Sequence, residues 1–131
     1  MIKALTRAEI EAGAQKMGLR HRDLYVVLSR PTNGLDAILE NGPAHIAYQM
    51  ELETKGIIFA AGPLMLADQD VSEGEGLIVL RADSLEHAHQ IADADPMHQC
   101  GARKYIIRPW VMTEGSSSIK LNYSTQTFDI M

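Results

Sequence analysis

Two residues of this chain carry side chains that can move protons near neutral pH. His45 follows Pro43 and Ala44, and Asp95 lies in the segment Ala-Asp-Ala-Asp-Pro at positions 92–96. The surrounding pattern places His45 in the first turn of a predicted helix and Asp95 just past the end of another. Side chains at helix ends are well displayed, and an imidazole with a carboxylate can accept and return a proton. The two residues are therefore a candidate catalytic dyad.

Each of these residues also has a purely structural interpretation. A histidine near a helix start can bond to the backbone, and an aspartate before Pro96 can form an Asx turn. The positive end of a helix dipole favours a neutral imidazole, whereas the negative end disfavours a carboxylate such as Asp95. A partner such as His45 would offset that cost. A third interpretation is a structural pair in which Asp95 only ties two loops together.

Metal binding is the other chemistry to weigh. His87 and His89 are two positions apart on a predicted helix and do not face the same way. His98 and Cys100, together with Asp95, could approximate a ligand set, but they match no established zinc spacing. We therefore expect no metal and no cofactor. Cys100 is expected to be a small packed residue rather than a nucleophile.

Length and composition limit the class of protein. The chain has 131 residues, 46% hydrophobic and 22% charged, which is ordinary for one globular domain. Its formal net charge of −5 argues against nucleic-acid binding, which needs a basic face. A single cysteine favours a reducing compartment, and no apolar run resembles a signal peptide or a membrane span. We expect a cytoplasmic protein.

The elements that must position the dyad follow the order β-α-β-β-α-β. Strands are predicted at 24–28, 57–61, 77–80 and about 102–112. One helix should run from Pro43 to Lys55, and a second should start at Asp83 or Ser84 and stop before Pro96. The order predicts an α+β, ferredoxin-like fold with two helices over one face of a four-stranded antiparallel sheet. The strands are apolar on both faces, so we also predict a homodimer or higher homo-oligomer joined sheet to sheet.

Two extensions flank this core within a single predicted domain, 1–131. Residues 1–22 form an accessory N-terminal helix, with a capping box from Thr6 to Glu9 and an end at Gly18. The core spans 23–113. The C-terminal extension, 114–131, holds a predicted strand at 119–123, added to the sheet edge or exchanged with a partner. The acidic connection 63–75 is either solvated surface or a lid.

Short segments in this order resemble the YCII-related family. They are Pro-Ala-His at 43–45, Gly-Ile-Ile at 56–58, Ala-Gly-Pro at 61–63, Asp-Ser-Leu-Glu at 83–86, the segment 92–96 and Arg-Pro-Trp at 108–110. The resemblance covers roughly 24–112. It implies a dimeric α+β barrel related to the muconolactone isomerase fold, with a histidine–aspartate pair in a cleft, and that pair falls on His45 and Asp95.

Two positions depart from the family pattern. Gly42 stands where family members often carry arginine, which removes a donor for an anionic group, and Met97 stands where an aromatic residue often follows Asp-Pro. One activity in the family resembles dehydrochlorination of a chlorinated hydroxyquinol. We therefore predict cofactor-independent elimination or isomerisation of a small cyclic or aromatic metabolite, with His45 as the base and Asp95 orienting it. The alternative is a non-catalytic protein that binds a small ligand or serves a catabolic pathway.

Overall fold

The structure of the chain is a computed structural model that describes residues 3–130. The chain divides into two compact units. One unit spans Asp23–Trp110 and contains both residues of the predicted dyad. The other is made of the described residues of 1–22 and 111–131. Each unit is treated below by itself.

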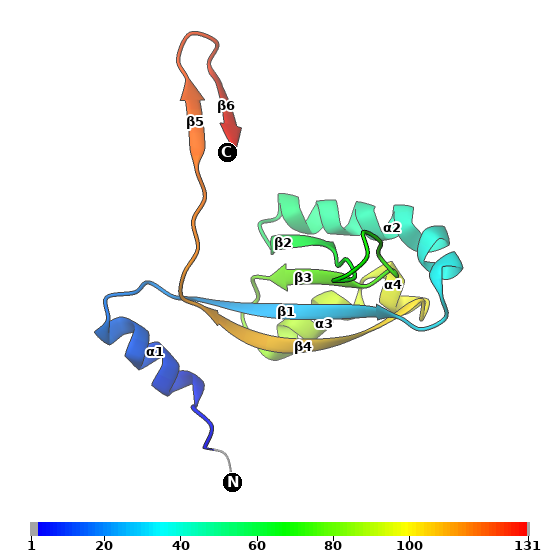
Figure 1. Cartoon of the computed structure of the whole chain (residues 1–131), viewed down its shortest axis with the longest axis horizontal. Coiled ribbons are helices and arrows are strands. Elements are labelled where there is room, and N and C mark those ends of the chain that lie inside the picture. The colour runs from blue at the N-terminus through cyan, green and yellow to red at the C-terminus, as the bar shows by residue number, and fades with distance from the viewer. Residues whose placement is uncertain (1–2, 131) are drawn as a thin grey trace. The chain divides into compact units, whose positions relative to one another are not determined.

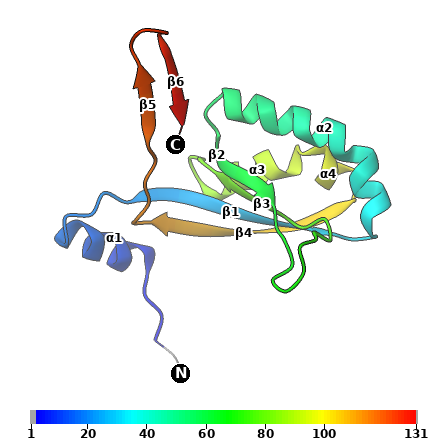
Figure 2. The ribbon, with the colours of Figure 1, turned by 45° about the horizontal axis from the view of Figure 1, so that its top comes forward.

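An antiparallel sheet of four strands forms the centre of the fold (Figure 1). Its strand order is β2-β3-β1-β4, and the helices α2, α3 and α4 lie on one side of it (Figure 2). This confirms the predicted α+β, β-α-β-β-α-β arrangement. The strands are β1 (Arg22–Pro31), β2 (Ile58–Pro63), β3 (Gly76–Leu80) and β4 (Arg103–Met112). The helices are α2 (Leu35–Thr54), α3 (Leu85–Asp93) and α4 (Pro96–Gln99).

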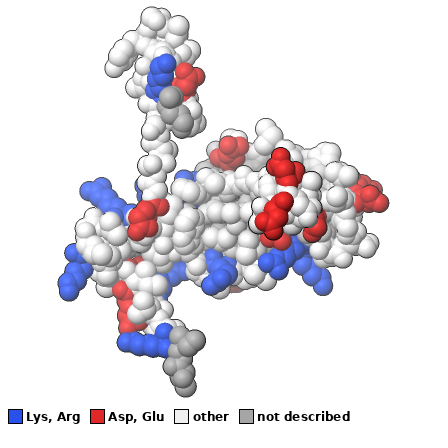
Figure 3. Space-filling model, in the orientation of Figure 1, with Lys and Arg blue, Asp and Glu red and all other residues white. Residues whose placement is uncertain are grey.

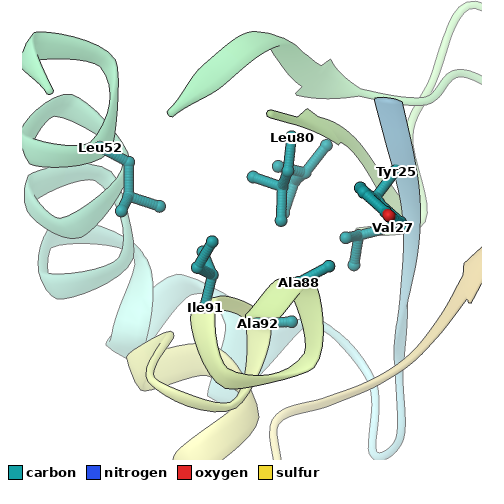
Figure 4. Close-up of a cluster of buried hydrophobic side chains, with 8 residues drawn as sticks. Tyr25, Val27, Leu52, Leu80, Ala88, Ile91 and Ala92 are labelled. Atoms are coloured by element: carbon teal, nitrogen blue, oxygen red, sulfur yellow. The ribbon is translucent and has the colours of Figure 1, made fainter. Parts of the chain in front are cut away.

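The core lies between the sheet and these helices (Figure 4). Tyr25 pairs with Leu80 and Val27 with Ile78 across β1 and β3, so alternate residues of both strands point to the same face. There they meet Leu52 of α2 and a small apolar patch of α3, formed by Ala88, Ile91 and Ala92. Burial of these side chains holds α2 and α3 against the sheet.

Helix α2 begins eight residues before the predicted start. Pro43 lies inside the helix, which starts at Leu35 after Gly34. An internal proline costs about 3 kcal/mol because it removes a backbone hydrogen bond. Burial of Ile38 against Met97 of α4 stabilises the preceding turns and offsets that cost. His45 therefore lies in the interior of the helix, and the prediction of a first-turn position near the positive dipole end was wrong.

A second correction concerns Pro96. The helix before it ends at Asp93, as predicted, but the proline does not exclude further helix, because it occupies the start of α4. Asp95 is the N-cap of this helix, and its side chain accepts the backbone N–H of Met97 at 2.9 Å. Proline is well suited to this place because the first helical N–H has no partner inside the helix. In α3 the capping residue is Ser84, whose side chain accepts the N–H of His87.

The connection between β2 and β3 is tied to itself. The N–H of Leu64 donates to the carbonyl of Glu75 at 2.8 Å, and that of Leu66 donates to Val71 at 2.9 Å. These bonds extend the hairpin beyond the two strands. They favour the interpretation of this segment as a solvated surface turn over that of a lid.

The second unit contains a helix and a hairpin. Helix α1 (Arg7–Lys16) has the predicted capping box, since Glu9 N–H donates to Thr6 Oγ1 and Thr6 N–H to the Glu9 carboxylate. Strands β5 (Ile119–Asn122) and β6 (Thr127–Ile130) pair with each other in a two-stranded sheet. The prediction that this tail adds an edge strand to the core sheet was wrong. A partner only a few residues away closes a short loop at small entropic cost.

The surface carries both signs of charge. Figure 3 shows basic and acidic side chains on the drawn face of the Asp23–Trp110 unit. Within residues 3–130, no helix is long and apolar enough to span a bilayer.

Candidate active site

The fold brings His45 and Asp95 into direct contact. Nδ1 of His45 lies 2.9 Å from Oδ1 and 2.8 Å from Oδ2 of Asp95. The histidine side chain is 13% exposed and the aspartate side chain 2%. Helix α2 supplies the ring, and the cap between α3 and α4 supplies the carboxylate. The carboxylate is therefore buried, whereas part of the histidine ring remains accessible.

One face of α2 sets this geometry. His45, Tyr48, Gln49 and Leu52 follow the spacing i, i+3, i+4 and i+7, which places them on one side of a helix. Leu52 is buried in the core, and the hydroxyl of Tyr48 donates to the carbonyl of Ile91 on α3 at 2.7 Å. These anchors fix how far α2 stands from the end of α3. They therefore fix the distance between the ring and the carboxylate.

Asp95 is held as a carboxylate. Besides the ring of His45, its oxygens accept the N–H of Met97 at 2.9 Å and the amide of Gln49 at 3.1 Å. Burial by itself raises the pKa of Asp95. The hydrogen bonds from His45 and Met97, together with the electrostatic effect of His45 and His98, outweigh burial and lower the pKa of Asp95 below its usual 3.8. The group is thus a fixed acceptor at neutral pH.

This arrangement selects one tautomer of His45. Because the Asp95 carboxylate can only accept, the bonded Nδ1 of His45 carries the proton. Nε2 then keeps a lone pair, and among the described residues it has no hydrogen-bond partner. The ring lines a cavity of about 650 Å³. A neutral imidazole oriented in this way can act as a general base toward a molecule in that cavity.

The cavity lies between α2, β2, the start of β3 and α4, and its wall is mostly apolar. Ile46, Met50 and Phe59 are among the apolar side chains that line it. Its volume falls within the range of small-molecule sites. Gly42, the position where the family resemblance predicts an arginine, also lines the cavity. A small ring compound fits this space.

Arg103 is a cavity residue that sequence analysis did not single out. It is the only lysine or arginine in the wall of the cavity, counted over residues 3–130. It is 8% exposed, and its Nε has no hydrogen-bond partner. Burial lowers its pKa and the charge of Asp95 raises it, but a guanidinium remains protonated in proteins. The signal available in the sequence was its alternation with Tyr105 and Ile107, which both pack on the core.

The other candidate ligands are engaged separately. His98 lies with Nδ1 2.6 Å from the carbonyl of Ala92 and with Nε2 2.6 Å from the hydroxyl of Ser29. Cys100 is exposed, so the expectation that it is packed was wrong. It stands at the C-terminal cap of α4, where its thiol lies 3.6 Å from the Met97 carbonyl.

His87 and His89 belong to α3 and do not join the site. Nδ1 of His87 accepts the backbone N–H of Asp83 at 3.1 Å. Nδ1 of His89 lies 3.1 Å from the hydroxyl of Tyr105. Both histidines therefore have partners of their own outside the site.

Comparison with known proteins decides the family. Residues 24–111 match the model of the YCII-related domain, which is more than half of the chain. The chain belongs to the YCII-related family. The protein YciI of Escherichia coli O6:H1 is 29% identical over 93 residues, covering 66% of this chain and 95% of that protein. YciI of Shigella flexneri matches to the same extent.

A solved structure shares the fold. It is 5-chloro-2-hydroxyhydroquinone dehydrochlorinase (TftG) from Burkholderia phenoliruptrix AC1100, in complex with 2,5-dihydroxybenzoquinone. The two structures align with a TM-score of 0.58 and 24% identity, over 66% of this chain and 92% of TftG. The share of this chain that aligns with TftG equals the share that aligns with YciI, 66% in both comparisons.

Proposed function

We propose that this protein is an enzyme that moves a proton on a small cyclic or aromatic metabolite without a cofactor. His45 is the general base, and Asp95 is the positioning residue that orients it. The contact of His45 Nδ1 with Asp95 at 2.8 Å, beside a cavity of about 650 Å³, carries this proposal. The contact leaves the other ring nitrogen available to a molecule in the cavity.

The chemistry follows from the charges. Nε2 of His45 takes a proton from the substrate, and the ring becomes an imidazolium. The Asp95 carboxylate stabilises that cation, and its low pKa keeps it from taking the proton itself. Gln49 holds Asp95 through its amide N–H, and its own Oε1 is buried without a partner, so it can accept a substrate hydroxyl. General base catalysis of this kind contributes about 10²–10⁴-fold in rate.

Elimination of chloride is one reaction that this dyad can perform. With a chlorinated hydroxyhydroquinone, His45 takes a hydroxyl proton and the ring tautomerises to a ketone with an sp³ carbon that bears chlorine. Chloride then leaves that carbon as a second hydroxyl group of the ring loses its proton, which gives a hydroxybenzoquinone and HCl. The name of TftG supports this class of substrate. An isomerisation uses the same first step and returns the proton at another atom.

Chloride release from 5-chloro-2-hydroxyhydroquinone under anaerobic conditions tests the proposal. We expect turnover by the natural chain and its loss in His45→Gln, with a cooperative thermal unfolding transition retained. Equal turnover in both proteins would contradict the role of His45. Calorimetric binding of 2,5-dihydroxybenzoquinone is measured in parallel. Tight binding without turnover of chlorinated or isomerisable ring substrates would favour the alternative, a non-catalytic small-ligand-binding protein.

We further propose that the chain forms a homodimer through the open face of its sheet, giving the dimeric α+β barrel. Tyr25 and Val27 point to the helices, so Val26 and Leu28 point away from them. On β4, Ile106 and Trp110 are 54% and 40% exposed. Apolar side chains on the uncovered face of a sheet are typical of an interface between subunits.

Sedimentation or light scattering tests this assembly. We expect twice the mass of the chain for the natural protein and a single-chain mass for Ile106→Asp. Val71→Asp is the matched control, because Val71 is exposed in the β2–β3 connection. A single-chain mass for the natural protein would contradict the dimer. The single cysteine also leads us to propose the cytoplasm as the site of action.

A further inference from the structure

The strongest unexplained feature of the cavity is a buried cation with no partner. Arg103 is 8% exposed, and no salt bridge or hydrogen bond joins its guanidinium to the part of the chain that the structure describes. Taking a charged group out of water is costly unless another charge or hydrogen bonds compensate it. The nearest compensation within the structure is the electrostatic effect of Asp95, which is already committed to His45 and Met97.

The backbone makes room for this guanidinium. Arg103 belongs to β4, yet its head lies over Gly76 of β3, two strands away across β1. A Cβ at position 76 would stand 3.3 Å from Nη1 of Arg103. Gly76 and Arg103 both line the cavity. The side chain therefore crosses the sheet beneath the helices and presents its donors where a ligand would lie.

We propose that Arg103 binds an anionic oxygen of the ligand, so the substrate of this site carries a carboxylate or an ionised enol or phenol. The guanidinium offers donors in a planar fork that matches such oxygens. Glu53, the other residue of the wall that is charged at neutral pH, is exposed and forms no salt bridge with Arg103. An anion bound here is held while His45 acts on a proton elsewhere on the ring. The inference rests on the proposed function for that second step only.

Binding of two probes separates charge from shape. 2,5-Dihydroxybenzoquinone is ionised at neutral pH because its enols are vinylogous acids, and 2,5-dimethoxy-1,4-benzoquinone is its uncharged ether. In titration calorimetry we expect Arg103→Met to lower the affinity for the anionic probe by about 10-fold or more. This loss corresponds to the free energy of hydrogen bonds to a charged group. Affinity for the ether should not change. Equal affinity of the natural chain and Arg103→Met for the anion would overturn the inference, as would an equal loss for both probes.

Three further variants keep the test decisive. Arg108→Met removes the same charge from an exposed position of β4 and should bind the anion normally. Gly76→Ala keeps the charge but puts a Cβ 3.3 Å from Nη1 of Arg103, which shifts the guanidinium by a few tenths of an ångström. This variant should weaken binding of the anion more than binding of the ether, and it tests the inference even if Arg103→Met fails to fold. His45→Gln should bind both probes. Loss of turnover in His45→Gln tests the proposed catalysis separately, so either idea can fail without the other.

Discussion

Two histidines near Asp95 differ in what their second nitrogen does. His45 gives one ring nitrogen to Asp95 and leaves the other free beside the cavity. His98 lies between the Ala92 carbonyl and the Ser29 hydroxyl, each at 2.6 Å, so both of its nitrogens are engaged. Its ring also packs on Tyr105, with centroids 4.7 Å apart. Both histidines lower the pKa of Asp95. Of the two, His45 alone keeps a ring nitrogen that can bind a ligand.

The difference separates a catalytic environment from a structural one. A ring with both nitrogens bonded gains stability for the fold and has nothing to offer to a substrate. A ring with one nitrogen bonded is oriented, and its other nitrogen can take a proton. Proximity to a carboxylate is therefore not sufficient to identify a base. The unpaired atom and the adjacent cavity make the distinction.

The largest expected effect on turnover comes from replacing each of the two histidines in turn. His45→Gln should lower turnover by about 10²–10⁴-fold, because it removes the proposed base, while the chain stays folded. His98→Gln should retain most turnover per folded molecule and lower the unfolding temperature. Steady-state rates and thermal unfolding of both variants check this. A greater loss of turnover in His98→Gln than in His45→Gln would reverse the assignment of roles.

Asp95→Asn should lower turnover by about 100-fold, since the amide no longer requires the proton to stay on Nδ1 of His45. It should also change the pH dependence of stability. The pKa of Asp95 is lower in the folded chain than its ordinary value of 3.8. Its contribution is therefore complete above pH 3.8 and is lost as pH falls through the folded value.

The contribution is about 1.4 kcal/mol for each unit by which the pKa is lowered. Urea unfolding of the natural chain and of Asp95→Asn, from pH 7 down to pH 3, measures it. The stability difference between the two proteins should be constant at the upper end and shrink at the acid end. A difference that grows as pH falls would contradict a lowered pKa for Asp95.

The smallest effect on turnover is expected for Ser29, the hydrogen-bond partner of His98. Ser29→Ala removes the hydroxyl that lies 2.6 Å from His98 Nε2 in a position that is fully buried. Loss of this bond should destabilise the fold by about 1–3 kcal/mol and leave turnover per folded molecule intact. Chemical denaturation with an active-site titration checks both. Loss of turnover without loss of stability would show that this pair belongs to the catalytic machinery.

Much of the fold and one contact of the site could be predicted from the sequence. The strands are short runs of β-forming residues between turns, and the Thr6–Glu9 cap has a local signature, so both were found. The pairing of His45 with Asp95 followed from residue type and from the family resemblance. Gln49 was recognisable from its i+4 spacing to His45, because helical geometry places such residues together.

Other features depended on contacts that no local pattern contains. Proline normally marks a helix start, so the helix was placed at Pro43; burial of Ile38 against Met97 extends it back to Leu35. The sequence alternates after residue 118 like an edge strand, yet the nearest complementary strand was its own tail. Arg103 looked like one of several scattered basic residues until the sheet placed it over Gly76.

What the sequence alone determined is the order of elements, the family and the two residue types able to transfer a proton. These depend on periodicity, capping and short motifs, which are properties of neighbouring residues. Only the tertiary structure decided that Nε2 of His45 is left unpaired beside a cavity and that a lone guanidinium shares that cavity. The reason is physical: whether a polar atom has a partner depends on distances between segments far apart in the chain, and packing sets those distances.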